Sequence, residues 1–176
     1  DYVGLVSQSS IICAGPKYQI LAPQFFDMRP ACLEARWARI DTCDKAFICM
    51  GGTDPLALTP RALETVLKSL TDIHVEVAIG SASACLPQVL DIAKKNVERV
   101  KVHVDAKNMP DLMCEADIAV GAGGTMTWER NCLGLPSIML IMVENQEKAG
   151  RAMQQHQAAY VIDAQAGYPG AEVARG

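Results

Sequence analysis

The sequence predicts an α/β fold, a doubly wound parallel sheet of the Rossmann-like kind. From Lys45 onward, apolar runs of strand length alternate with helical segments about five times, which is typical of a parallel sheet with helices on both faces. The chain has 176 residues, of which 50% are hydrophobic and 20% charged, so it is large and apolar enough to bury a core. Because parallel strands are joined by right-handed crossovers, the ligand crevice of such a sheet lies beyond the carboxyl ends of its strands.

Each element follows from its own pattern. Apolar runs predict strands over residues 45–50, 73–80, 99–105, 117–124, 136–142 and 158–164. The segments between them predict helices over residues 59–70, 86–95, 109–116, 128–133 and 144–156. Leu63 and Val66 fall on one face of the first helix. Val100, Val102 and Val104 alternate with polar residues, as in a half-exposed strand.

Residues 1–44 follow a different pattern. They contain a Gly-Pro pair, further prolines and aromatics, and only Leu33, Trp37 and Ile40 recur at helical spacing. We therefore predict an interdomain connector there, with one short helix over residues 29–40. Residues 45–176 are predicted to form the Rossmann-like domain, cut short at both ends relative to a longer protein.

Composition narrows the possible partners. The net charge is −4 and no face or run of Lys and Arg occurs, which argues against binding of nucleic acid. The longest apolar stretch, residues 135–143, is too short to cross a membrane, and we predict a cytoplasmic protein. The seven cysteines are scattered and lack zinc spacing, which favours buried thiols in a reducing compartment over a disulfide frame. No acidic cluster indicates a metal, and no cofactor is predicted.

Three loops follow the first, fourth and fifth predicted strands, at residues 51–55, 121–127 and 144–146. All three lie at the same edge of a parallel sheet, so we expect their residues to converge. In the loop 121–127, the glycines allow close approach of backbone, and the following helix offers N–H groups to a phosphate, aided by Thr125 and Thr127. A tight turn with a capping threonine is an equally good interpretation.

Polar residues near these loops also allow two interpretations. Glu129 either accepts hydrogen bonds from two ribose hydroxyls or favours the helix dipole from the first turn. Asp54 either borders a ligand or caps a turn, and Asn145 either faces the crevice or caps a helix. His103 and Asp105 lie two residues apart, where a half-exposed strand face is favoured over a catalytic pair.

Four segments, in this order, resemble a known family: GPKYQILAPQF, GGTDP, GAGGTMTWERNCLGLPSI and ENQ. They are similar to the carboxyl-terminal half of the UDP-sugar hydrolases of pseudaminic acid biosynthesis and to the related spore-coat polysaccharide proteins. The resemblance covers residues 15–160. It implies a GT-B-type architecture like that of MurG-type glycosyltransferases, in which this chain is the carboxyl-terminal domain and holds UDP or a UDP-sugar.

The resemblance also implies roles for single residues. Gly123, Gly124 and Thr125 would bind the diphosphate, Glu129 the ribose hydroxyls and Asn145 the phosphate or sugar. The sugar would be bordered by Gly52, Thr53 and Asp54. The catalytic histidine of this family belongs to an amino-terminal domain that has no counterpart in this chain.

The implied activity is release of UDP from a UDP-linked diacetamido-trideoxy sugar, by attack of water on the anomeric carbon. This chain alone would bind nucleotide without turning over substrate, and its partner would be the amino-terminal catalytic domain. The alternatives are the donor-binding domain of a MurG-like UDP-sugar glycosyltransferase and a non-catalytic domain that binds UDP-sugars.

Overall fold

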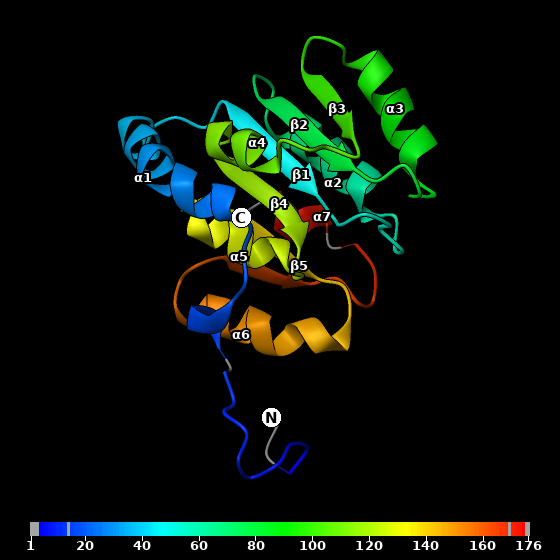
Figure 1. The fold of residues 1–176 in the computed structure, drawn as a ribbon. Helices are drawn as coiled ribbons and strands as arrows, with labels where there is room; N and C mark the ends of the chain where they lie inside the picture. The colour runs from blue at the N-terminus through cyan, green and yellow to red at the C-terminus, as the bar shows by residue number, and fades with distance from the viewer. Residues whose placement is uncertain (1–3, 14, 169, 175–176) are drawn as a thin grey trace.

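Six parallel strands form the centre of this computed structural model, which describes residues 4–13, 15–168 and 170–174. They are β1 (Lys45–Cys49), β2 (His74–Ile79), β3 (Val100–Val104), β4 (Ile118–Ala122), β5 (Ser137–Ile141) and β6 (Tyr160–Asp163). Their order across the sheet is β3-β2-β1-β4-β5-β6 (Figure 1). The chain thus builds outward from β1 to β3, then returns to the other side of β1 and builds outward again. The predicted doubly wound sheet is confirmed.

Helices cover both faces of the sheet. They are α1 (Pro23–Ala38), α2 (Leu58–Ser69), α3 (Leu86–Lys95), α4 (Met109–Glu115), α5 (Met126–Cys132), α6 (Glu147–Gln155) and α7 (Gly170–Val173), with 3₁₀ turns at Pro16–Tyr18 and Glu144–Gln146. Because successive strand residues point to opposite faces, Ile48 of β1 packs toward α2, α3 and α7. Phe47 packs toward α1, α4 and α5 on the other face, where α6 covers Met139 of β5.

Helix α1 starts at Pro23, earlier than the predicted helix over residues 29–40. Proline suits a first helical turn because its missing N–H would have no helical partner there. The helix is fixed to the domain by two arginines. The guanidinium of Arg36 donates to the carbonyls of Ala116 (2.6 Å) and Met113 (3.2 Å), at the end of α4. Arg39 donates to the Asp117 carboxylate at 3.1 Å. The α1 part of the predicted connector therefore packs against the sheet domain.

The expectation that all cysteines are separate thiols is wrong. Cys32 of α1 and Cys114 of α4 form a disulfide across a sequence separation of 82 residues. The error has a physical reason, since cysteines so far apart become neighbours only when α1 packs against α4. Cys49 and Cys85 are buried free thiols, as expected, whereas Cys43 is exposed.

The remaining differences are small. The predicted helix over residues 144–156 divides into the 3₁₀ turn and α6, and the short α7 was not predicted. The ends of the two predicted segments, at residues 1–3 and 175–176, lie outside the described residues. In the part of the chain that the structure describes, no helix is long and apolar enough to cross a membrane.

We expect the disulfide to stabilise the domain, because it closes a long loop in the unfolded chain. Cys32→Ser should lower the free energy of unfolding by about 2–4 kcal/mol, measured by urea denaturation without reductant. Dithiothreitol should lower the free energy of unfolding of the native protein and of a Cys43→Ser control by the same amount. It should leave that of Cys32→Ser unchanged. Equal stability of Cys32→Ser and the native protein would contradict this expectation.

Candidate functional site

The three predicted loops converge at the carboxyl edge of the sheet. Strands β1 and β4 are neighbours, with Cys49 opposite Gly121, so the loops that follow them begin side by side. The loop after β5 joins them through Gln146, whose Cβ is 3.2 Å from the point that a Cβ on Gly123 would occupy. The carboxamide oxygen of Gln146 accepts a hydrogen bond from the Met142 N–H at 2.9 Å, which holds this loop in place.

The glycines of the loop after β4 differ in what surrounds them. A Cβ on Gly121 would lie 2.5 Å from a terminal nitrogen of Arg130 and 2.8 Å from the Cys49 carbonyl oxygen. A Cβ on Gly123 would lie 2.5 Å from the methyl carbon of Met139. Gly121 is therefore required by a contact with backbone inside the domain, whereas a side chain at Gly123 would displace the end of the Met139 side chain. Around Gly124 no described atom lies within 4 Å of the Cβ position, so the turn is open to a ligand there.

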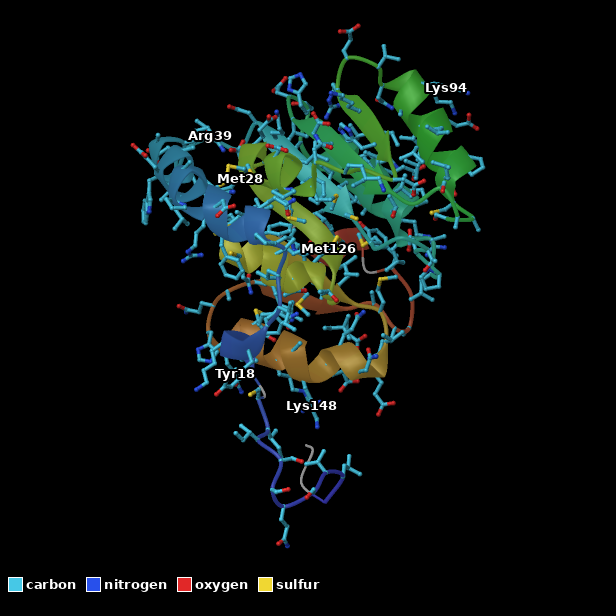
Figure 2. All side chains as sticks on the ribbon, viewed as in Figure 1. Tyr18, Met28, Arg39, Lys94, Met126 and Lys148 are labelled. Atoms are coloured by element: carbon cyan, nitrogen blue, oxygen red, sulfur yellow. A yellow bond between two sulfur atoms is a disulfide. The ribbon has the colours of Figure 1, made fainter. Side chains whose placement is uncertain are left out.

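The amino terminus of α5 has no side-chain cap. Thr125 occupies the N-cap position and is exposed, yet among the described residues its hydroxyl makes no capping hydrogen bond. Met126, labelled in Figure 2, starts the helix beside the open turn. Thr127 is buried and its hydroxyl lies 3.4 Å from the Ala122 carbonyl. Of the two threonines, only Thr125 is therefore available to a ligand.

Arg130 lies beneath this turn and was missed in the sequence. Its side chain is 1% exposed, and one terminal nitrogen donates to the Ala122 carbonyl (3.1 Å) and the Thr127 hydroxyl (3.2 Å). Burial lowers the pKa of Arg130 to about 10, opposed by the neighbouring Cys49 and Glu129. The sequence could have shown that Arg130 is buried. It lies three residues after Thr127 and three before Leu133, both buried, and residues three apart share a helix face.

Glu129 lies about one turn into α5 and is half-buried. Burial raises the pKa of its carboxyl, and the positive charge of Arg130 opposes that shift. Within the described ranges, its carboxylate has no ion-pair partner at the site. A half-buried carboxylate without a protein partner is free to accept hydrogen bonds from a ligand.

The GGTDP loop after β1 caps the start of α2. Asp54 is buried and accepts hydrogen bonds from the N–H groups of Leu58 (3.0 Å) and Thr59 (2.7 Å). This is the capping interpretation of Asp54, and its carboxylate would have to leave the helix to contact a sugar. Gly52 and Thr53 of the same loop are exposed, and Gly52 lines a hollow beside the turn after β4.

Asn145 is exposed in the 3₁₀ turn after β5. No side-chain cap is formed at either end of that turn within the described residues. Its neighbour Gln146, rather than Asn145, lies against the Gly123 position of the glycine turn.

A hollow of about 350 Å³ adjoins the turn. It is lined by Cys49 and the glycines after β1, the end of β2, the segment from Asp105 to Lys107 after β3, and Met126. Its volume is at the lower end of the range for small-molecule sites. Burial raises the pKa of the Cys49 thiol, so this side chain is a neutral, weakly polar part of the floor. The contribution of the loop after β3 was not foreseen in the sequence.

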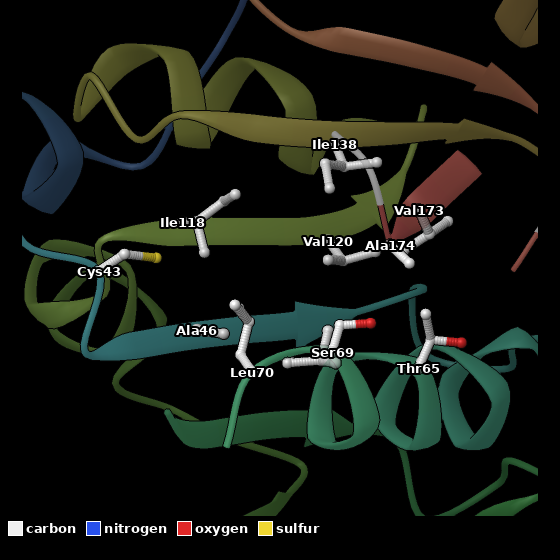
Figure 3. Close-up of a pocket in the computed structure, with 11 residues that line it drawn as sticks. Cys43, Ala46, Thr65, Ser69, Leu70, Ile118, Val120, Ile138, Val173 and Ala174 are labelled. Carbon is white, nitrogen blue, oxygen red and sulfur yellow. The ribbon is translucent and has the colours of Figure 1, made fainter. Parts of the chain in front are cut away.

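Two other features lie outside this site. His103 is bonded to Glu76 of the adjacent strand rather than to Asp105, whose carboxylate accepts from the Ser81 N–H at 3.0 Å. A second hollow, of about 240 Å³, lies between the sheet, α2 and α7 and is almost entirely apolar (Figure 3). Among the described residues, no group of three or more His, Cys, Asp or Glu side chains is suited to hold a metal ion.

Comparisons with known proteins give two relatives in sequence, and no family model matches the chain. The chain is 30% identical over 156 residues to the spore coat polysaccharide biosynthesis protein SpsG of Bacillus subtilis, covering 88% of this chain and 44% of SpsG. It is 26% identical over 136 residues to an uncharacterized protein of Methanocaldococcus jannaschii, covering 76% and 28% respectively. The chain is thus a distant homologue of SpsG and spans less than half the length of either relative.

Solved structures that share the fold include MurG and WaaG. MurG of Acinetobacter baumannii superposes with a TM-score of 0.58 at 15% identity, covering 80% of this chain and 42% of MurG. WaaG, a glycosyltransferase involved in lipopolysaccharide biosynthesis, superposes with a TM-score of 0.56 at 14% identity, covering 88% and 41%. The shared fold confirms the predicted Rossmann-like α/β class.

The capping role of Asp54 can be measured as stability. Asp54→Ala should lower the free energy of unfolding by about 1–2 kcal/mol, because it leaves two N–H groups of α2 without their acceptor. The matched variant Thr53→Ala alters an exposed neighbour and should change the free energy of unfolding by less than about 0.5 kcal/mol. Urea denaturation gives both values, and equal stability of the two variants would refute the capping role.

Proposed function

We propose that this chain is the nucleotide-binding half of a UDP-sugar hydrolase, which releases UDP from a UDP-linked diacetamido-trideoxy sugar in the synthesis of pseudaminic acid. The observation that carries the proposal is the open turn at Gly124 and Thr125, with the half-buried carboxylate of Glu129 one turn further on. The homology to SpsG supports a role in polysaccharide synthesis.

The turn suits a diphosphate. The switch between β1 and β4 is where ligands bind in open α/β sheets, because the chains leaving these strands diverge. At this point Gly124 offers a backbone N–H group, whereas the Gly123 N–H already donates to the Leu140 carbonyl at 3.0 Å. The Thr125 hydroxyl has no capping bond within the described structure, and no side chain fills the space at Gly124. The same groups would stabilise the charge that develops on UDP as it leaves.

The nucleoside fits beside the diphosphate. Glu129 would accept hydrogen bonds from the two ribose hydroxyls, a task for which its partly desolvated carboxylate is suited. The neighbouring hollow of about 350 Å³ has an apolar floor and would receive the base. Gly52 and Thr53, exposed after β1, and Asn145, after β5, would border the sugar from either side of the turn.

The reaction is a displacement by water. A water oxygen attacks the anomeric carbon, the bond from that carbon to the UDP oxygen breaks, and the water's second proton goes to a base. The proposal assigns that role to no described group of this chain, because Asp54 caps α2, Glu129 would be engaged by the ribose and His103 is bonded to Glu76. An amino-terminal domain would supply the catalytic histidine, and this chain alone would be inactive.

A UDP-sugar glycosyltransferase is the second candidate, and the shared fold with MurG and WaaG favours it. The donor site would be the same, and a sugar hydroxyl would replace water as the attacking group. A domain that binds UDP-sugars without catalysis would use the same residues. An assay of the longer protein with a UDP-sugar, with and without acceptor sugars, separates these candidates by whether the product is free sugar, a glycoside or neither.

Calorimetric titration tests the proposed ligand. UDP should bind more tightly than UMP or CDP, and Glu129→Ala should weaken UDP binding by about 1–3 kcal/mol, through the loss of charge-assisted hydrogen bonds. Glu64→Ala, which removes an exposed carboxylate on α2, is the matched control and should bind as the native protein does. Equal affinities for UDP and CDP, or no effect of Glu129→Ala, would sink the proposal.

The pH dependence gives a separate check on Glu129. Because its pKa is raised, the carboxylate is lost at a higher pH than for an ordinary glutamate. The preference for UDP over 2′-deoxy-UDP should therefore be largest near neutral pH and decline as the pH falls through that raised pKa. Comparing the two ligands cancels the titration of their phosphates. In Glu129→Gln the preference should be small and independent of pH, whereas a native-like decline in that variant would exclude Glu129 as the titrating group.

A further inference from the structure

Arg130 is a buried cation that forms no salt bridge with any residue the structure describes. Its side chain is 1% exposed. Its Nε and one terminal nitrogen also have no hydrogen-bond partner in the described structure. A buried guanidinium is strongly disfavoured unless it is paired, so such a residue calls for a reason beyond packing.

The position of the guanidinium supplies that reason. One terminal nitrogen joins the Ala122 carbonyl, at the start of the glycine turn, to the Thr127 hydroxyl just after it. The other lies 2.5 Å from the Cβ position of Gly121, itself 2.8 Å from the Cys49 carbonyl. The charge therefore lies at the switch between β1 and β4, directly beneath the open turn.

The charged groups around Arg130 do not neutralise it. Glu129, on the same helix, forms no salt bridge with Arg130 within the described residues, and the Cys49 thiol is neutral because burial raises its pKa. The low pKa of Arg130, about 10, has the same origin in burial. An anion on the outer side of the turn would provide the missing negative charge, and in a poorly hydrated site the attraction acts over several ångströms.

We propose that Arg130 is a positioning residue, whose buried charge attracts the diphosphate of the ligand through the glycine turn and whose hydrogen bonds hold that turn open. It does not touch the ligand. The inference rests on the proposed function, because it takes the anion to be the diphosphate of UDP. A purely structural arginine would hold the turn in the same way but would not distinguish charged from uncharged ligands.

The test compares ligands that differ in charge. The probes are UDP, UMP and uridine, titrated calorimetrically into the native protein, Arg130→Lys and Arg130→Met. We expect Arg130→Met to lose about tenfold or more in affinity for UDP, less for UMP and almost none for uridine, while Arg130→Lys keeps UDP affinity within about threefold. Arg99→Met is the matched control, because Arg99 is a partly buried arginine at the opposite edge of the sheet, bonded to the carbonyls of Ile73 and Leu70. Its UDP affinity should equal that of the native protein.

Two outcomes would overturn the inference. In one, Arg130→Met binds UDP as well as the native protein does. In the other, the affinities for UDP and uridine fall by the same factor, which would make Arg130 structural only. If circular dichroism shows that Arg130→Met does not fold, nitrogen-15 NMR of arginine-labelled native protein decides instead. The Arg130 Nε–H signal, assigned by its loss in Arg130→Lys, should shift with UDP and not with uridine, and an unmoved signal overturns the inference.

Inorganic pyrophosphate separates this inference from the proposed function. A native protein that binds pyrophosphate but prefers no nucleotide would refute the UDP proposal, and weaker pyrophosphate binding by Arg130→Met would still support the role of Arg130. A native protein that binds UDP, together with an Arg130→Met variant of equal affinity, refutes the role of Arg130 alone. A native protein that binds neither UDP nor pyrophosphate refutes both.

Discussion

The parallel pairing of β1 with β4 is the interaction on which the rest of the site depends. The chain runs from β1 outward to β3 and returns to start the other half of the sheet at β4, so the loops after these two neighbouring strands lead in opposite directions. Their carboxyl ends are held in register by the pairing of Cys49 with Gly121. A side chain at residue 121 would separate the strands, because the Cys49 carbonyl and Arg130 already occupy that space.

The two loops at this switch differ in how the helix that follows each of them is capped, and the proposed anion site lies at only one of them. At the start of α2 the buried carboxylate of Asp54 already satisfies two N–H groups and opposes the helix dipole. At the start of α5 no described side chain does so, and a buried cation lies below instead of an anion. Positive potential therefore remains at the turn after β4, next to a hollow large enough for a small molecule.

The domain is also reinforced far from the site. Helix α1 is tied to the end of α4 by the disulfide between Cys32 and Cys114 and by hydrogen bonds from Arg36 and Arg39 to carbonyls of that region. Since α4 follows β3 and precedes β4, these bonds brace the return of the chain across the sheet. The segment over residues 4–13, by contrast, is exposed along its length and extends away from the sheet (Figure 1).

The sequence by itself determined the α/β class, the order of the elements and the three loops of the candidate site. These features depend on local periodicity, and patterns such as Leu63 with Val66, or the strand residues Val100 and Val102, can be recognised without knowing what packs against them. The position of Glu129 in the first turn of a helix follows in the same way.

Only the tertiary structure showed what surrounds the polar and glycine residues of the site. Whether Asp54 caps a helix, which glycine of the turn is open and where the Arg130 charge lies all depend on segments distant in sequence. The pairing of Cys32 with Cys114 depends on the packing of α1 against α4. Contacts of this kind produce no periodic pattern in the sequence, because they join residues that are far apart in the chain and meet only when the helices and strands pack together.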